Sequence, residues 1–328
     1  MTRFLLMCAL LLPVFAGAQG VEGYYRYPAI HDNFILFTAE GDLWKVGDEG
    51  GLAQRLTTHP GKETNAAISQ DGKWVAYSAE YEGPTEVYVM PVAGGIPIRC
   101  TFEGETAIVV GWTPQSQVLY TTQKYSGLPN WVLATYDLEK KKSELLPLYQ
   151  ANDGNYNPQD NTLFFTRLPF QGSRTKRYVG GTAQNIWKFP PAGPEALSLT
   201  ADYSGTSKNP MYWDGRVYYI SDQDGTMNLW SMNTSGADRM QHTFHSGMDI
   251  ANPCLQNGRI VYQQVADIFI YDIASATDKK LRITLVSDFD QKREKWVQSP
   301  MDYLSSASIS PDGDRAVLIS RGQVFIFP

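Results

Sequence analysis

The residues that could carry out nucleophilic, acid–base or metal chemistry are few and lie far apart along the chain. The histidines are His31, His59, His242 and His245, and none belongs to a His-Glu-x-x-His pattern. His242 and His245 are three residues apart, a spacing that does not bring two side chains onto one metal in a strand or loop. No Gly-x-Ser-x-Gly elbow is present. We therefore predict no catalytic residue, no metal site and no cofactor in this chain.

Two further features have a structural explanation. Asp222-Gln223-Asp224-Gly225 faintly resembles a calcium loop, but the EF-hand spacing is missing, and a hairpin turn needs the same residue types. Cys100 and Cys254 form no Cys-x-x-Cys pair, which excludes a zinc ribbon. An exported protein could form a disulfide between them, but they fall in different repeats. We therefore expect two separate buried thiols.

The segment best suited to bind a ligand is a loop that interrupts the fourth of the repeats described below. Its candidate peptide-binding residues are Arg174, Lys176, Arg177 and Tyr178, whose cations could hold a peptide carboxylate. The pair Gly180-Gly181 would allow a peptide backbone to come close. Extra loops in repeat proteins gather on one face, often the binding face. The alternative is that this loop packs against a neighbouring domain or subunit.

An internal repeat supplies the elements that must position these residues. The clearest unit runs from 65 to 101 and contains four short strands separated by turns with Asp-Gly, Gly-Pro and Gly-Gly. The predicted strands are 66–69, 74–79, 86–90 and 96–100. Four antiparallel strands in a unit of about 40 residues make one blade of a β-propeller.

The same pattern recurs along the chain. The units start near residues 27, 66, 108, 152, 209, 252 and 307. One long interval holds the extra loop at 169–183. The other holds the segment 286–306, which is charged and lacks strand alternation. The seventh unit stops one strand short of a blade, which would leave an unpaired edge. We therefore expect a truncated piece of a longer protein.

These intervals predict an all-β fold, a six-bladed β-propeller of four-stranded antiparallel blades followed by the start of a second propeller. The expected parts are a signal peptide over 1–18, the propeller over 19–285, a linker over 286–306 and the first strands of a second, truncated propeller over 307–328.

The N-terminus has the features of a secretory signal peptide. Arg3 supplies the positive charge, Phe4 to Phe15 is an apolar run, and Ala16-Gly17-Ala18 suits cleavage. The apolar run is too short to span a bilayer, and no other run is as long. We expect an exported protein, periplasmic or secreted, with no membrane span. The formal charge of −6 argues against a nucleic-acid partner.

Several segments resemble known propeller families. The turn Ser310-Pro311-Asp312-Gly313 is typical of TolB-type and prolyl-oligopeptidase-type propellers. A closer resemblance is to the tricorn protease family. It rests on 27–31 with 39–44 for the opening, 176–187 for the fourth blade, 221–230 for the fifth, and 310–313 with 320–325 for the start of a second propeller.

The resemblance implies a six-bladed propeller ahead of a seven-bladed one, a PDZ module and a serine-peptidase core, assembled into hexamers. It implies that the propellers guide peptides to and from the active site, and that the catalytic residues lie beyond this chain. The expected partners are then peptides and the parent protein's second propeller, PDZ and peptidase domains. The alternative is a TolB-type periplasmic binding scaffold without enzymatic activity.

Overall fold

The computed structural model describes residues 23–125, 130–169, 177–191, 193, 195–288, 298–320 and 323–328. These residues form β-strands joined by turns and loops, with a short 3-10 turn at Pro300–Tyr303. The chain divides into two compact units, Met1–Val286 and Ser287–Pro328. The predicted signal peptide lies outside the described residues, as do residues 289–297 of the predicted linker. No helix in the described ranges is long and apolar enough to cross a membrane.

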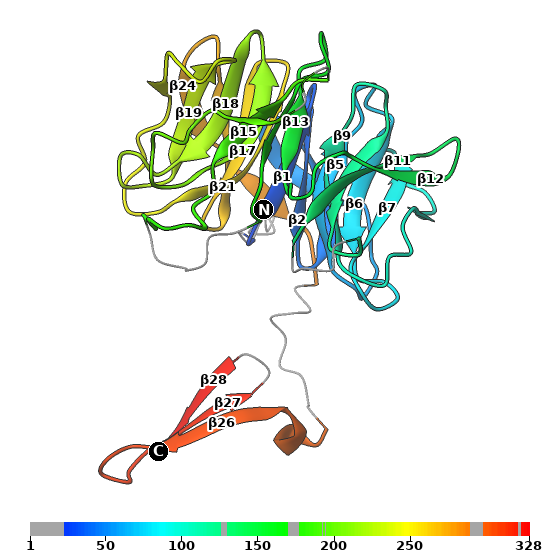
Figure 1. Cartoon of the computed structure of the whole chain (residues 1–328). Coiled ribbons are helices and arrows are strands. Elements are labelled where there is room, and N and C mark those ends of the chain that lie inside the picture. Colours follow the sequence, from blue (N-terminus) through cyan, green and yellow to red (C-terminus); the bar gives the residue numbers. More distant parts are fainter. Residues whose placement is uncertain are drawn as a thin grey trace, which may run out of the picture. The chain divides into compact units, whose positions relative to one another are not determined.

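The first unit contains six sheets, each built from four consecutive antiparallel strands (Figure 1). This confirms the predicted all-β fold and its repeat. The first three sheets hold β1 (Arg26–His31), β2 (Phe34–Ala39), β3 (Asp42–Gly47) and β4 (Gly50–Arg55); β5 (Glu63–Ile68), β6 (Trp74–Ala79), β7 (Glu86–Pro91) and β8 (Ile98–Arg99); and β9 (Ala107–Trp112), β10 (Val118–Thr122), β11 (Val132–Asp137) and β12 (Lys142–Leu145). The next three hold β13 (Gly154–Tyr156), β14 (Leu163–Thr166), β15 (Ile186–Phe189) and β16 (Leu197–Ser198); β17 (Ser207–Trp213), β18 (Arg216–Ser221), β19 (Asn228–Asn233) and β20 (Met240–Gln241); and β21 (Ile250–Gln256), β22 (Arg259–Gln264), β23 (Asp267–Asp272) and β24 (Thr277–Lys280).

Two-residue turns set the register of the first hairpin in several sheets. Asp214 and Gly215 join β17 to β18 with φ of 44° and 79°, and Asn257 and Gly258 join β21 to β22 with φ of 50° and 73°. Two successive residues with positive φ match the right-handed twist of the flanking strands, which is why Asp-Gly and Asn-Gly favour such hairpins. Both turns fall in the units that the sequence predicts to start near 209 and 252.

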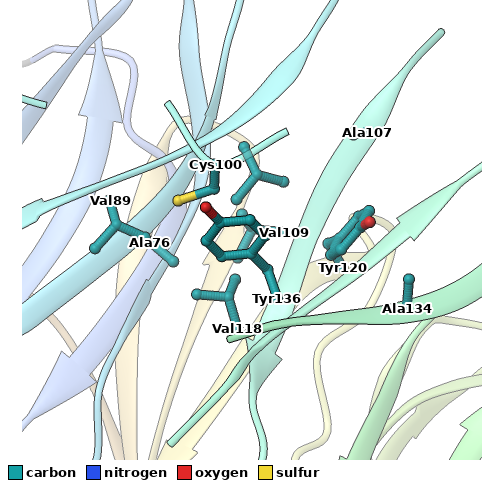
Figure 2. Packing of buried hydrophobic residues seen from close by; sticks show 10 residues of the cluster. Ala76, Val89, Cys100, Ala107, Val109, Val118, Tyr120, Ala134 and Tyr136 are labelled. Atoms are coloured by element: carbon teal, nitrogen blue, oxygen red, sulfur yellow. The ribbon is translucent and has the colours of Figure 1, made fainter. Parts of the chain in front are cut away.

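The middle strands of the sheets are apolar on both faces because a neighbouring sheet packs on each side. In β10, Val118 and Tyr120 join a cluster with the second sheet, whereas Leu119 joins a cluster with the fourth. Figure 2 shows the first of these layers, in which Val89 lies with Val118 and with the thiol of Cys100. Face-to-face packing of successive sheets therefore forms the core.

A threonine after the last strand ties four of the sheets together internally. Its hydroxyl accepts the backbone N–H of the residue at or near the start of the third strand, always 14 residues earlier. The four pairs are Thr57 with Leu43, Thr101 with Val87, Thr200 with Ile186 and Thr243 with Leu229, at 2.8–3.0 Å. The bond satisfies a buried amide where the short last strand has ended.

The first sheet carries an additional strand that the sequence did not predict. β25 (Ile283–Leu285) follows the last sheet and pairs in parallel with β4, opposite Gly51–Ala53. The N–H of Gly51 donates to the carbonyl of Arg282 at 2.8 Å. A segment that leaves the sixth sheet thus binds to the outer edge of the first.

Polar contacts also join the first and last sheets directly. Arg259 bonds to Asp48 at 2.6 Å and to the carbonyl of Asp32. The N–H of Asp32 donates to Gln256 at 2.9 Å, and the strands β1 and β21 lie in contact. The sheets are therefore neighbours even though more than 200 residues separate them in sequence.

The second unit, described by itself, is a three-stranded antiparallel sheet. It consists of β26 (Leu304–Ile309), β27 (Ala316–Ser320) and β28 (Gln323–Phe327). The first strand begins three residues before the predicted start at 307. The turn at Ser310 to Gly313 lies between β26 and β27, as the sequence predicts.

Candidate functional site

The innermost strands of the six sheets surround a central cavity of about 740 Å³. β1, β5, β9, β13, β17 and β21 contact one another in this order, and β21 contacts β1. All six contribute lining residues. Each is the edge strand of its sheet, so unpaired backbone groups would be free to bind an added strand.

Bulges and prolines interrupt these edges. The register shifts within β1, β5, β17 and β21, and Tyr27, Asn65, Asn209 and Asn252 have φ of 50–53° at these shifts. Proline follows three of the four, as Pro28, Pro210 and Pro253. Proline lacks an N–H and is tolerated in a sheet at an edge or a bulge. A peptide chain in the cavity would therefore meet interrupted rows of backbone donors and acceptors along these edges.

One carboxyl group lies at the junction of the fourth and fifth sheets. Oδ2 of Asp153 accepts the backbone N–H of Asn209 at 3.1 Å and its Nδ2 at 2.9 Å. Oδ1 of Asp153 is buried and has no partner among the described residues. Burial raises the pKa of Asp153 to about 6, opposed by the bond from Asn209 and by the charge of Lys208.

The predicted binding loop is only partly described. Arg174 and Lys176 lie outside the described residues. Arg177 is exposed beside the turn at Gly225, where an added Cβ would lie 3.6 Å from the guanidinium. The hydroxyl of Tyr178 accepts a hydrogen bond from Thr182 at 2.9 Å. The structure thus brings Arg177 to a turn of the fifth sheet, while Pro169, at the start of this loop, lines the cavity.

A serine and a histidine meet in the fifth sheet, which the sequence analysis missed. Oγ of Ser231 lies 2.7 Å from Nε2 of His242, whose Nδ1 lies 3.1 Å from the hydroxyl of Tyr271. Ser231 is fully buried and accepts a bond from Arg216 at 3.1 Å. Burial, then the charge of Arg216, lowers the pKa of His242. A substrate cannot reach this hydroxyl, so the contact is structural.

The other candidate groups have local partners. Oδ1 of Asp222 accepts the hydroxyl of Tyr203 and the N–H of Thr206, both at 2.9 Å, so its carboxylate stabilises the loop. Cys100 and Cys254 are separate free thiols, as expected, but only Cys100 is buried, whereas Cys254 is half-buried and lines the cavity. Within the described ranges, no group of three or more His, Cys, Asp or Glu side chains is arranged to hold a metal.

Six consecutive antiparallel sheets around one cavity define a β-propeller. Residues 22–277 match the tricorn protease N-terminal β-propeller domain family, and the chain belongs to that family. The chain is 29% identical over 312 residues to the tricorn protease homolog of Saccharolobus solfataricus, covering 93% of this chain and 28% of the relative. It is 24% identical to the tricorn protease of Thermoplasma acidophilum, covering 91% and 28%.

Structural comparison agrees in fold. The crystal structure of the tricorn protease superposes with a TM-score of 0.78 at 22% identity, over 93% of this chain and 30% of that one. Two proteins of Sulfurisphaera tokodaii, a putative tricorn-like protease C-terminal subunit and an N-terminal subunit, match 36% and 34% of this chain. The chain thus spans about 28% of the length of the curated tricorn relatives named above.

Proposed function

We propose that this propeller guides peptides to or from a serine-peptidase core that it does not itself contain. The observation that supports the proposal most directly is the central cavity, which all six innermost strands line. Membership of the tricorn N-terminal propeller family supplies the link to proteolysis. The catalytic role therefore falls to another part of a parent protein or to a partner subunit.

The proposal includes the partners and the location. Separate N-terminal and C-terminal subunits among the relatives support association with peptidase parts through non-covalent contacts. The family resemblance is the basis for proposing a second propeller, a PDZ module and a hexameric assembly. The signal-peptide features of residues 1–18 are the basis for proposing export. The alternative of a TolB-type scaffold has weaker support, since TolB of Francisella tularensis matches 63% of the chain at 27% identity.

A substitution that narrows the cavity tests the proposed peptide-guiding role. Asn152 lines the cavity, so Asn152→Trp in the active peptidase should narrow it. We expect kcat/KM for peptides of ten or more residues to fall at least about fivefold while a dipeptide reporter is unaffected. Glu144→Trp, on the exposed outer strand β12, is the control. Equal loss for both peptide lengths, or no loss, would contradict the proposal.

The loop cations have their own test. If Arg174, Lys176 and Arg177 anchor peptide C-termini, reversing their charges in the active enzyme should raise KM for short peptides. Stability should barely change on reversal at Arg177, which is exposed, since exposed substitutions stay within about 0.5 kcal/mol. An unchanged KM would favour packing of this loop against a neighbouring domain or subunit.

Hydrolysis by this chain alone would contradict the proposal that it guides peptides while a separate peptidase core cleaves them. We expect no turnover of fluorogenic peptides by the purified chain at high concentration, because the Ser231–His242 contact is inaccessible. Turnover that survives purification and disappears in Ser231→Ala would place an active site in this chain.

A further inference from the structure

The lining of the central cavity has a distinctive chemistry. Among its described residues are nine Asn or Gln side chains and six aromatic rings, whereas the His, Asp and Lys side chains number three, His31, Asp153 and Lys208. The rings belong to Tyr27, Trp112, Trp131, Tyr156, Tyr212 and Trp213. A volume of about 740 Å³ lies within the range of about 300–1,000 Å³ for ligand sites.

The backbone of the lining strands is poorly suited to hold a peptide by strand addition. Peptides that add to a sheet edge need a continuous run of backbone donors and acceptors. Here Pro28, Pro210 and Pro253 lack the N–H group, and bulges shift the register at the same places. Recognition must then come from the side chains that line the cavity.

Several of the amide side chains are held at one end and open at the other. Oδ1 of Asn155 accepts the N–H of Tyr212 at 2.9 Å, so its Nδ2 is held in place, and no described residue bonds to it. Nδ2 of Asn209 donates to Asp153, and Nε2 of Gln184 donates to the carbonyl of Leu168 at 2.8 Å. The amide oxygens of Asn209 and Gln184 have no partner among the described residues. Such fixed, uncharged groups suit the peptide bond, which carries both a donor and an acceptor.

The charges of the cavity offset one another. Lys208 lies near Asp153, and its charge acts on that carboxyl. His31 is buried, with Nε2 3.1 Å from the carbonyl of Gln70 and Nδ1 3.4 Å from the carboxylate of Asp32. Asp153 and Lys208 carry opposite charges, so a charged peptide side chain would lose hydration on entry and gain little net attraction from the pair. A neutral side chain would lose less and could pack against the rings.

We propose that the central cavity selects uncharged peptide segments, held by amide and aromatic side chains, and disfavours segments with charged side chains. This inference rests on the proposed role in peptide handling and names the substrate class that the cavity accepts. It concerns the propeller alone and is separate from the cleavage specificity of any peptidase core.

Binding to the full chain tests the inference. The probes are acetylated and amidated pentapeptides of Ala and Phe whose central residue is Asn, Asp or Lys. Isothermal titration calorimetry measures affinity, and fluorescence of Trp112, Trp131 and Trp213 reports occupancy of the cavity. We expect the Asn peptide to bind at least about tenfold more tightly than the Asp and Lys peptides, a difference of about 1.4 kcal/mol.

Asn155→Asp provides a charge-only variant, because the new carboxylate can still accept the N–H of Tyr212. It should favour the Lys peptide by at least about fivefold relative to the unmodified chain and weaken the Asp peptide further. Asn161→Asp, the same change at an exposed turn of the same sheet, should alter neither affinity.

The possible results distinguish a failure of the proposed selectivity from a failure of the proposed peptide-guiding role. Equal binding of the three peptides, or an Asn155→Asp variant that behaves as Asn161→Asp does, overturns the selectivity and leaves peptide guiding intact. No binding of any peptide, or binding of neutral oligosaccharides in place of peptides, overturns both.

Discussion

At the scale of single residues, the threonines that follow the last strands are a repeated structural device. Oγ1 of Thr243 accepts the N–H of Leu229 and donates to Oδ1 of Asn228, both at 2.9 Å and both buried. Replacing it with valine keeps the shape and removes both bonds. We expect Thr243→Val to lower the free energy of unfolding by about 1–3 kcal/mol in urea denaturation, since a buried amide is left unpaired.

Thr277 gives the matched control because it is exposed at the start of β24. Thr277→Val should change stability by no more than about 0.5 kcal/mol. Equal effects of the two substitutions would mean that the hydroxyl of Thr243 does not stabilise the sheet.

Asp153 gives a pH-dependent prediction. Its folded pKa of about 6 lies above the ordinary value of 3.8, so the folded state binds this proton more tightly than the unfolded state does. The carboxyl therefore favours folding at pH 4, and that contribution is lost as the pH rises through 6. Relative to Asp153→Asn, the unmodified chain should lose about 1–3 kcal/mol of stability between pH 4 and pH 7.

Urea denaturation of both proteins at the two pH values measures this difference and cancels the other titrating groups. A difference that stays constant with pH, or grows in the opposite direction, would show that Asp153 titrates normally in the folded protein.

The site residues were only partly predictable from sequence. Arg177 and Tyr178 stand out because they interrupt a repeat, but the neighbour of Arg177 depends on which turn of the next sheet lies beside the loop. The contact of Ser231 with His242 has no sequence motif, because it joins β19 to the residue that follows β20. The threonines that follow the last strands could be recognised in the sequence, because the ends of two units read Arg55-Leu56-Thr57 and Arg99-Cys100-Thr101.

At the scale of elements, the pairing of β25 with β4 depends on two glycines. Gly50 has φ of 87°, and an added Cβ would lie 2.5 Å from the carbonyl oxygen of Arg282. Gly51 has φ of 102° with nothing within 4 Å of that position. We expect Gly50→Ala to displace β25 and destabilise the chain more than Gly51→Ala, because both strain the backbone but only one also clashes.

Hydrogen exchange at the Gly51 amide, measured in the Gly50→Ala variant, reports on its bond to the carbonyl of Arg282. Protection should fall at least about tenfold there, with the amides of β10 unaffected. Unchanged protection would mean that β25 tolerates the added methyl group.

Some strands are specified by residues close to them in the sequence, and others by a pairing partner far away in the sequence. Hairpins such as β17–β18 could be placed from sequence because Asp214 and Gly215 fix the turn and the apolar alternation fixes the strands. β25 could not, since three residues carry too little pattern and its partner β4 lies over 220 residues earlier. The bulge at Asn209 was likewise hidden, because a strand pattern does not reveal an extra residue.

At the scale of the whole molecule, the junction of the first and last sheets depends on a few polar groups. Arg259 bonds to Asp48 at 2.6 Å and to the carbonyl of Asp32, and both carboxylate and guanidinium are largely buried. We expect Arg259→Gln to lower the free energy of unfolding by about 1–3 kcal/mol. Lys142→Gln, which removes an exposed pair with Glu144, should cost no more than about 0.5 kcal/mol.

Equal stability of the two variants in urea denaturation would show that the junction does not depend on Arg259. A loss confined to Arg259→Gln, with unchanged circular dichroism, would show that this guanidinium holds the two sheets together.

The position of β25 also has a consequence in time. Each hairpin can form as soon as its own residues leave the ribosome, but the outer edge of the first sheet has to wait for residues 283–285. At about 5–20 residues per second, synthesis of the roughly 230 residues between β4 and β25 takes about 12–46 s. Throughout that time β4 is an unprotected edge, and we expect its two glycines and the charge of Arg55 at its end to disfavour pairing with a neighbouring chain.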